Sequence, residues 1–424
     1  VYGGSNNHNA VVTEAPTRPD KSGLDSYIQL HCTGSGWDGV DNVPVLQTVN
    51  GTTYAYVLYD GYGASGALVA KIRCAENGGS SIVWTTDPYG TEGTSLNAKS
   101  GFQLSTPYLD DKGTPDDASD DTLYVGTISQ YDDYEGGEWL TGTGSKVMAL
   151  TGLDQNKPTV TNVLTGINGQ INTPITTDGT YLYFGTWPGG SNAGTYYQVK
   201  LSDYSVKTFT PDSYGFYWAG AVSDGTNVYF GSDNGLLYWR SIADFDTTGG
   251  VLDLTDVASD AGNVRSTVML DDGYLYFTTQ GGYLWCCSYD DGLTVEWHKK
   301  LGATSTSTPT KVGDRIYVGY YSGFNAGGVQ CVSADGSSVK TVVEGDGFPV
   351  QSSIVVMGDG TGTDYLYFNT NAQKGVGYCY SYDGTTGSQV WGTTGDTYAL
   401  GGMAIDNGYA VFGNDYNHLY VVHD

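Results

Sequence analysis

Positive charge is scarce in this chain. Its 424 residues include 18 Lys and Arg against 46 Asp and Glu, which gives a formal net charge of −28 at pH 7. A protein that binds nucleic acid needs clustered cations to neutralise the phosphates. We therefore expect no nucleic-acid partner.

Long apolar runs are missing as well. No stretch of about 18 consecutive apolar residues occurs, so the sequence predicts no transmembrane helix. Lysine is in short supply, Asp, Gly, Thr and Tyr are abundant, and Asn50-Gly51-Thr52 forms a glycosylation-type triplet. These features are typical of exported proteins, and we expect an extracellular or cell-surface location.

Cysteine and histidine are too few and too scattered to form a familiar site. The six cysteines are too sparse for a disulfide framework and make no CxxC pair. The five histidines show no HExxH motif, and the chain has no GxSxG motif. Cys286 and Cys287 are adjacent and could form a vicinal disulfide. We favour two small apolar residues that face opposite sides of one strand.

A repeat fills most of the chain. A turn with Asp or Gly, followed by an aromatic-rich strand, recurs eight times at an average spacing of about 51 residues, which is in the range of four-stranded propeller blades. The copies centre on Tyr56, Tyr124, Tyr183, Tyr229, Tyr276, Tyr317, Tyr367 and Val411. Alternating apolar and polar residues with almost no helical periodicity predict an all-β fold, an eight-bladed β-propeller with four-stranded antiparallel blades.

The order of strands within a copy predicts how the ring closes. A short strand of small residues precedes the turn and aromatic-rich strand of each copy, which suits an innermost strand crowded against a central channel. The last copy stops after its third strand at Asp424, so we expect residues 25–32 to complete that blade. We predict one domain over residues 1–424, with a lead-in over 1–24 and blades over 41–424.

The segment from Ser381 to Trp391 resembles the quinoprotein-like repeat, also called the PQQ-like repeat, in which Asp-x-x-Thr-Gly precedes a Trp that docks against the neighbouring blade. Trp84 and Trp297 occupy similar places in degenerate copies. Residues 6–12, followed by Ala15-Pro16, are similar to the lead-in of many such proteins. The resemblance implies an eight-bladed propeller and says little about activity.

Two branches of that family are relevant. One comprises dehydrogenases that hold pyrroloquinoline quinone and calcium over the channel, with a vicinal disulfide against the cofactor. The other comprises non-catalytic propellers, including the outer-membrane assembly lipoprotein and surface proteins. Aligning the Asp-Gly turns places Cys287 level with Cys331 and Cys379, within a third strand and not on a loop. We therefore favour the non-catalytic branch and expect no quinone cofactor.

An acidic loop over residues 110–121 is the strongest local anomaly. Calcium prefers hard oxygen donors of this kind, although the spacing does not fit an EF-hand. A structural calcium ion and a merely solvated, self-repelling loop both remain open. The candidate ligands are Asp110, Asp111, Asp116, Asp117, Asp120 and Asp121.

Aromatic residues gather where a propeller usually binds its ligands. The loops between second and third strands open on the same face as the connections between blades. Tyr and Trp offer large, rigid contact areas with a polar group, which suits sugars or protein segments. The candidate binding residues are Tyr131, Tyr134, Trp139, Trp187, Tyr214, Tyr217, Trp218, Tyr320 and Tyr321.

These patterns predict a monomeric, non-enzymatic propeller for binding or adhesion at a cell surface, with a glycan or protein ligand. Two alternatives stay open. The first is an enzyme, either a quinone- and calcium-dependent dehydrogenase or a polysaccharide-degrading propeller. The second is a structural scaffold for surface assembly.

Overall fold

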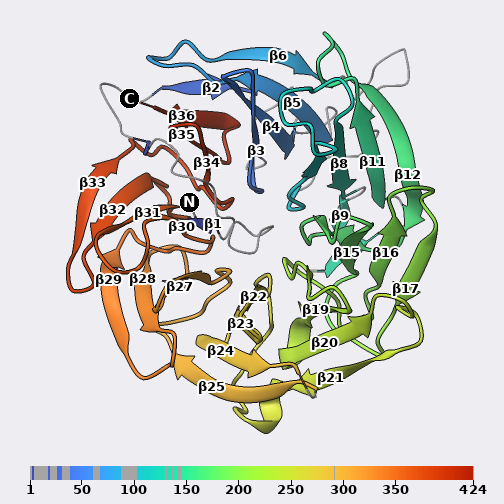
Figure 1. The fold of residues 1–424 in the computed structure, drawn as a ribbon, viewed down its shortest axis with the longest axis vertical. Helices are drawn as coiled ribbons and strands as arrows, with labels where there is room; N and C mark the ends of the chain where they lie inside the picture. The colour runs from blue at the N-terminus through green and yellow to red at the C-terminus, as the bar shows by residue number, and fades with distance from the viewer. Residues whose placement is uncertain are drawn as a thin grey trace.

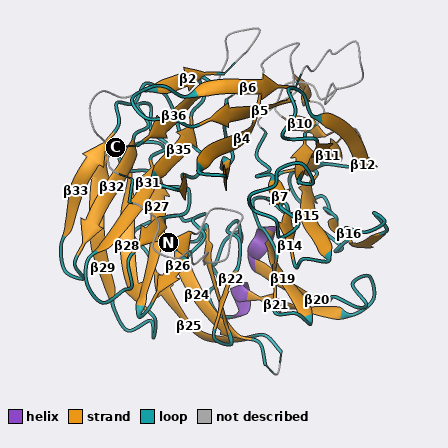
Figure 2. Ribbon diagram, turned by 45° about the horizontal axis from the view of Figure 1, so that its top comes forward, coloured by secondary structure: helices purple, strands orange, loops and turns teal. Residues whose placement is uncertain are grey.

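The computed structural model shows eight four-stranded antiparallel sheets arranged in a ring around a central axis (Figure 1). It describes residues 2–3, 18–19, 26–30, 39–60, 67–86, 103–128, 131–135, 138–141, 145–290 and 292–423. Strands make up nearly all of the regular structure (Figure 2). The predicted all-β, eight-bladed propeller is confirmed.

Each blade runs from an innermost to an outermost strand. Blade 1 contains β3 (Val45–Val49), β4 (Thr52–Asp60), β5 (Ala67–Arg73) and β6 (Ser81–Thr85). Blade 2 contains β7 (Tyr108–Asp110), β8 (Thr122–Thr127), β11 (Ser145–Thr151) and β12 (Thr159–Ile167), with the hairpin β9 (Tyr131–Glu135) and β10 (Glu138–Thr141) between β8 and β11. Blade 3 contains β14 (Thr176–Thr177), β15 (Tyr181–Trp187), β16 (Tyr196–Lys200) and β17 (Val206–Phe209), and β13 (Gln170–Ile171) also pairs with β15. Blade 4 contains β18 (Val222–Ser223), β19 (Asn227–Ser232), β20 (Leu236–Ser241) and β21 (Gly249–Asp253).

The second half of the ring follows the same order. Blade 5 contains β22 (Met269–Asp271), β23 (Tyr274–Thr279), β24 (Tyr283–Ser288) and β25 (Thr294–Lys300). Blade 6 contains β26 (Thr310–Val312), β27 (Arg315–Ser322), β28 (Ala326–Ser333) and β29 (Val339–Asp346). Blade 7 contains β30 (Val355–Met357), β31 (Asp364–Asn369), β32 (Gly377–Tyr382) and β33 (Gly387–Gly392), and β1 (Tyr2–Gly3) pairs with the inner side of β30. Blade 8 contains β34 (Ala404–Asp406), β35 (Tyr409–Gly413), β36 (His418–Val422) and β2 (Tyr27–Gln29). The only helices among the described residues are the single turns η2 (Asp233–Gly235) and η3 (Leu254–Asp256).

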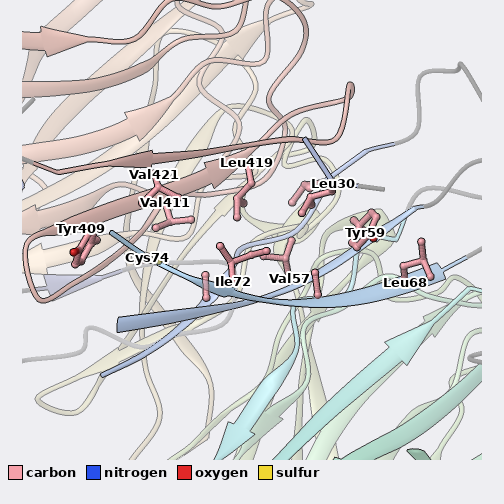
Figure 3. Packing of buried hydrophobic residues seen from close by; sticks show 13 residues of the cluster. Leu30, Val57, Tyr59, Leu68, Ile72, Cys74, Tyr409, Val411, Leu419 and Val421 are labelled. Carbon is pink, nitrogen blue, oxygen red and sulfur yellow. The ribbon is translucent and has the colours of Figure 1, made fainter. Parts of the chain in front are cut away.

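The N-terminal part of the chain closes the ring. Strand β2 pairs antiparallel with β36, with Tyr27 opposite Tyr420 and Gln29 opposite His418. Leu30 follows β2 and is completely buried in a cluster that joins blade 8 to blade 1 (Figure 3). In that cluster Val411 and Leu419 of blade 8 pack with residues of β4 and β5. The predicted closing strand is therefore confirmed.

Small hydroxyl residues line the inner ends of the blades and join each blade to the next. Three successive backbone N–H groups donate to a hydroxyl of the following blade: Gly220 to Thr267 at 3.2 Å, Thr267 to Thr308 at 3.0 Å, and Thr308 to Ser353 at 3.1 Å. These side chains are buried, and a buried N–H without a partner is costly. The small residues that mark innermost strands in the sequence therefore also hold the ring together.

Replacing Thr308 with Val tests this inner belt. The substitution keeps the shape of the side chain but leaves the buried N–H of Thr267 without its acceptor. We expect a loss of about 1–3 kcal/mol in the free energy of unfolding, measured by chemical denaturation. Thr308→Ser keeps the hydroxyl and should lose less than half as much; an equal loss for Ser and Val would show that the hydrogen bond is unimportant.

The recurring Asp-Gly turn has a direct physical role. Asp178 accepts hydrogen bonds from the backbone of Thr180 and Tyr181 and from the hydroxyl of Tyr183. Asp224 repeats the arrangement in blade 4, where the Tyr229 hydroxyl donates to it at 2.7 Å. In these two blades one carboxylate thus fixes the turn and satisfies the hydroxyl of the buried tyrosine two positions into the next strand.

Candidate functional site

The upper face, as we define it, carries the connections between second and third strands and the connections between blades. The lower face carries the remaining two kinds of turn. Trp187 ends β15, and residues 214–218 join blade 3 to blade 4, so both lie on the upper face. Asp233, Arg265 and Tyr321 enter the same face from blade 4, the blade 4–5 connection and blade 6.

An ion pair forms the centre of this site. The Arg265 guanidinium donates from Nε to one oxygen of Asp233 and from Nη2 to the other, both at 2.7 Å. The side chain of Asp233 is only 6% exposed and that of Arg265 18%. Burial opposes the charge of Arg265, but the Asp233 carboxylate raises the pKa of Arg265 above its ordinary value, so the site holds a permanent cation.

Aromatic side chains surround the ion pair. The indole N–H of Trp187 donates to Asp233 at 3.2 Å, and the ring of Tyr217 lies 4.4 Å from the guanidinium carbon of Arg265. Trp187 and Tyr217 meet edge to face, with ring centroids 5.3 Å apart. Three of the predicted binding residues, counting Trp218 next to Tyr217 at 5.0 Å, therefore belong to one cluster.

Blades 5 and 6 extend the cluster. Gln280 in the turn between β23 and β24 donates to the hydroxyl of Tyr321 at 3.4 Å, and Asn263 donates to Gln280 at 2.9 Å. Tyr321 is also close enough to influence the charge of Arg265. We call Trp187, Tyr217, Asp233, Arg265 and Tyr321 the upper-face cluster; its members come from blades 3, 4 and 6 and from the connections between blades 3 and 4 and between blades 4 and 5.

The segment over residues 214–218 has an unusual backbone. Tyr214 and Trp218 have φ values of 65° and 56°, in the left-handed region that side chains with a Cβ seldom adopt. The indole N–H of Trp218 is buried and has no hydrogen-bond partner among the residues that the structure describes. Such local costs persist where the surrounding structure fixes them, and they gather at binding and catalytic sites.

The other predicted aromatic residues lie elsewhere. Tyr131 and Tyr134 are on β9 and Trp139 is on β10, and their side chains fall outside the part of the chain that the structure describes. Tyr320 is buried within its blade: it is 5% exposed, and its hydroxyl donates to Glu344 of the outermost strand β29 at 3.2 Å. Burial and Glu344 raise the pKa of Tyr320 to about 12. Tyr320 therefore packs between strands and does not join the upper-face cluster.

The acidic loop lies on the lower face, between β7 and β8. Its carboxylates have separate local partners: Asp110 pairs with Lys112, Asp111 accepts from the backbone of Gly113, Asp116 from the backbone of Asn50, Asp117 from Ser119, Asp120 from Thr114 and Asp121 from Gln47. Among the described residues, no three His, Cys, Asp or Glu side chains gather in a way that could hold a metal ion. The structural calcium ion stays a prediction.

The cysteine alignment was wrong by one residue. Cys286, and not Cys287, is level with Cys331 and Cys379, because it pairs with Tyr276 as they pair with Tyr317 and Tyr367. The turn after β24 contains one extra residue, Asp290-Asp291 in place of a single Asp, so an alignment on Asp-Gly shifts the strand.

Cys286 and Cys287 are free thiols that face opposite sides of β24. Cys287 packs toward blade 4 and Cys286 toward blade 6. Both residues lie inside a strand, and neither lies on a loop above the channel. The prediction of two small apolar residues in one strand is confirmed.

The buried thiols should be unreactive in the native protein. Burial raises the pKa of Cys74 to about 12 and of Cys286 and Cys331 to about 11, and thiolate is the reactive form. At pH 8 we expect Ellman's reagent to modify these three cysteines at least 100-fold more slowly than in denaturant, with sites assigned by mass spectrometry. Raising the pH to 9 should speed the labelling of the native protein by about tenfold at most, because thiolate stays the minor form below the pKa. Fast native labelling of Cys286 would contradict the burial.

Several features of the sequence fall outside the described residues, namely the lead-in over 6–12 with Ala15-Pro16, His8, His31 and Cys32.

Sequence reasoning missed Asp233 and Arg265. An arginine in a connection between blades was a usable signal in a chain with so few cations. Asp233, which accepts from Arg265, could not be told from the other turn aspartates in the sequence. Only the fold brings Asp233 and Arg265 together.

Comparison with known proteins shows a shared fold. No protein-family model and no curated protein sequence matches the chain. BamB from Moraxella catarrhalis is 14% identical, with a TM-score of 0.55 over 94% of this chain and 100% of its own. Sqt1 from Saccharomyces cerevisiae is 11% identical, with a TM-score of 0.61 over 96% of this chain and 99% of its own. The computationally designed protein Ika8 is 10% identical, with a TM-score of 0.58 over 93% of this chain and 99% of its own. At such identities the similarity shows the propeller fold alone.

Proposed function

We propose that this protein is a non-enzymatic recognition propeller, exported or displayed at a cell surface, whose upper face binds a glycan or protein ligand. The convergence of Arg265, Asp233, Trp187 and Tyr217 from separate blades is the observation that carries the proposal. Trp, Tyr and Arg are the residues that most often dominate binding energy at interfaces.

The unused donors of Arg265 define what a ligand must supply. The Asp233 carboxylate occupies Nε and Nη2, and Tyr217 covers one side of the guanidinium. In the described part of the chain no acceptor is paired with Nη1 of Arg265. A ligand would therefore bring a carbonyl, carboxylate or hydroxyl oxygen to Arg265 and an apolar or sugar surface to the rings of Trp187 and Tyr217.

Fold similarity supports the family hypothesis in part. The likeness to BamB is in keeping with the quinoprotein-like repeat that Trp391 and its preceding turn indicate. The non-catalytic branch is favoured over a dehydrogenase because Cys286 and Cys287 lie within β24. A surface-assembly scaffold remains the second candidate, since the upper-face cluster would also suit a structural protein partner.

A binding screen tests the proposal. Labelled protein is applied to an array of cell-wall and host glycans and to a displayed library of random peptides. We expect hits that Tyr217→Ala weakens at least tenfold, whereas Val251→Ala, which trims a 53% exposed side chain on the outermost strand β21, should leave them unchanged. Binding that survives Tyr217→Ala would move the site away from the upper face. Stabilisation by pyrroloquinoline quinone with calcium, together with dye reduction on alcohols or aldoses, would replace the proposal with the dehydrogenase alternative.

A further inference from the structure

A cavity of about 710 Å³ opens on the lower face between blades 5 and 6. Tyr274, Tyr276 and Trp297 of blade 5 line one side of it, with ring centroids of neighbours 6.2–6.4 Å apart. Its volume is in the range of pockets that hold a ligand the size of a small molecule or a few residues of a peptide. The upper-face cluster has no part in it.

The same aromatic arrangement occurs in blade 7. In blade 5, Tyr274 and Tyr276 lie on the second strand, Tyr276 pairs with Cys286, and Cys286 pairs with Trp297. In blade 7, Tyr365 and Tyr367 hold the corresponding positions, Tyr367 pairs with Cys379, and Cys379 pairs with Trp391. The two blades therefore offer matching walls to their next neighbours.

In blade 7 the chain itself fills this place. The guanidinium of Arg18 lies 4.1 Å from the centre of the Tyr365 ring. The backbone carbonyl of the next residue, Pro19, accepts from the indole N–H of Trp391 at 3.2 Å and from the hydroxyl of Tyr367 at 3.4 Å. This wall therefore holds a cation over its first tyrosine and a backbone carbonyl at its second tyrosine and its tryptophan.

Blade 1 satisfies its wall in the same way. The Lys71 ammonium lies 4.2 Å from the centre of the Tyr54 ring, and the carbonyl of Leu153 accepts from Trp84 at 3.4 Å. Lys71 also donates to that carbonyl at 2.8 Å. Two blades of this chain therefore place a cation and a carbonyl on the Tyr-Tyr-Trp wall.

Blade 5 keeps the wall but has neither contact within the described residues. No cation lies over Tyr274 or Tyr276, and no acceptor is paired with the indole N–H of Trp297. Tyr274 is 39% exposed and Trp297 is partly exposed, whereas Trp84 and Trp391 are 5% and 7% exposed. The wall itself is firmly built, because Trp297 packs on Gly336 of blade 6 so closely that a Cβ there would lie 2.6 Å from the indole.

The charge of the cavity suits a cation. Asp272, Glu296, Asp314 and Asp335 line it, together with Asp271, which is paired with Lys311. An aromatic wall beside carboxylates is the environment that best stabilises an ammonium or guanidinium group.

We propose that the cavity between blades 5 and 6 is a docking site for an extended, arginine-containing segment of a partner protein. The guanidinium of the segment lies over Tyr274, near Glu296, and its following backbone carbonyl accepts from Trp297. The segment thus binds as Arg18-Pro19 binds blade 7.

The chain supplies its own probe for the test. A fluorescently labelled peptide with the sequence of residues 16–19, Pro-Thr-Arg-Pro, amidated at its end, is titrated with the full protein and followed by anisotropy. We expect saturable binding of this peptide. The same peptide with citrulline in place of arginine should bind at least tenfold more weakly, because citrulline keeps the shape of the side chain and removes its charge. No binding up to roughly 5 mM peptide, the weakest range such a contact could occupy, would overturn the proposal.

Matched variants locate the site. Tyr274→Ala removes an exposed ring without disturbing the core and should weaken peptide binding at least tenfold. Trp297→Phe keeps the packing but removes the indole N–H, and it should weaken peptide binding about threefold. The control, Tyr416→Ala, removes a ring that is 48% exposed in the β35–β36 turn and should have no effect. Unchanged affinity in Tyr274→Ala would place the peptide elsewhere, for instance in blade 7 by displacing Arg18. If acetyl-arginine amide, which lacks the residue after the arginine, bound as tightly as the peptide, the hydrogen bond from Trp297 to the carbonyl of that residue would contribute nothing.

Discussion

A chain that lacks residues 1–30 is expected to lose its cooperative unfolding transition or to melt at least roughly 10 °C lower than the full chain. The deletion removes β2, which pairs with β36, and Leu30, which is completely buried between blades 8 and 1. Loss of a buried leucine alone costs about 3 kcal/mol. The deletion also exposes the edge of β36 and the apolar side chains of Leu419 and Val421, which favours aggregation.

Two further chains separate ring closure from other effects of the deletion. A chain that lacks only residues 1–17 keeps Arg18-Pro19, β2 and Leu30 and should stay within a few degrees of the full chain. A chain without residues 1–30, but with residues 25–32 attached through a short linker after Asp424, should recover most of the lost stability, because β2 and β36 are antiparallel and adjacent. Differential scanning calorimetry measures all three. If the rearranged chain stays as unstable as the simple deletion, β2 does not act as the closing strand.

Replacing Asp233 with Ala should have the largest effect of any single substitution in the upper-face cluster. It leaves the mostly buried guanidinium of Arg265 without its counter-ion and the indole N–H of Trp187 without its acceptor. Breaking a buried ion pair in this way costs about 3 kcal/mol of folding free energy. Chemical denaturation measures the loss, and binding to any upper-face ligand should fall with it.

A double-mutant cycle distinguishes the charge from the packing. Arg265→Met removes the cation and keeps most of its apolar volume, so the double variant Asp233→Ala with Arg265→Met should be more stable than Asp233→Ala alone by about 1–2 kcal/mol. The double variant should remain folded yet bind no upper-face ligand. If the two substitutions were simply additive in stability, the ion pair would not be coupled as its geometry indicates.

The fold could be predicted from the sequence because its signals are local. The Asp-Gly turn and the aromatic-rich strand that follows it recur along the chain, and in blades 3 and 4 a hydrogen bond joins the turn aspartate to the tyrosine, as in Asp178 with Tyr183 and Asp224 with Tyr229. The closing strand followed from counting strands in the last copy. The extra aspartate in Asp290-Asp291 shifted the predicted alignment of Cys286 and Cys287 by one residue, because aligning copies on a turn assumes that every turn has the same length.

The site could be predicted only in part. The aromatic residues indicated the upper face, where Trp187, Tyr217 and Trp218 are in contact, and ligand binding there stays a prediction. Arg265 and Asp233 were missed because their partnership joins loops of different blades. Tyr320 and Tyr321 are neighbours in sequence, but side chains alternate along β27, so Tyr320 is buried and bonded to Glu344 of β29. A loop described only as aromatic does not reveal that difference.

Hydrogen–deuterium exchange of the protein with the tightest hit from the glycan and peptide screens tests the central claim most directly. Recognition at the upper face predicts slower exchange in peptides that cover residues 186–190, 214–218 and 263–267, with the blades below them unchanged. Protection confined to the lower-face turns around Asp178 and Asp224, or no protection outside the cavity between blades 5 and 6, would contradict it.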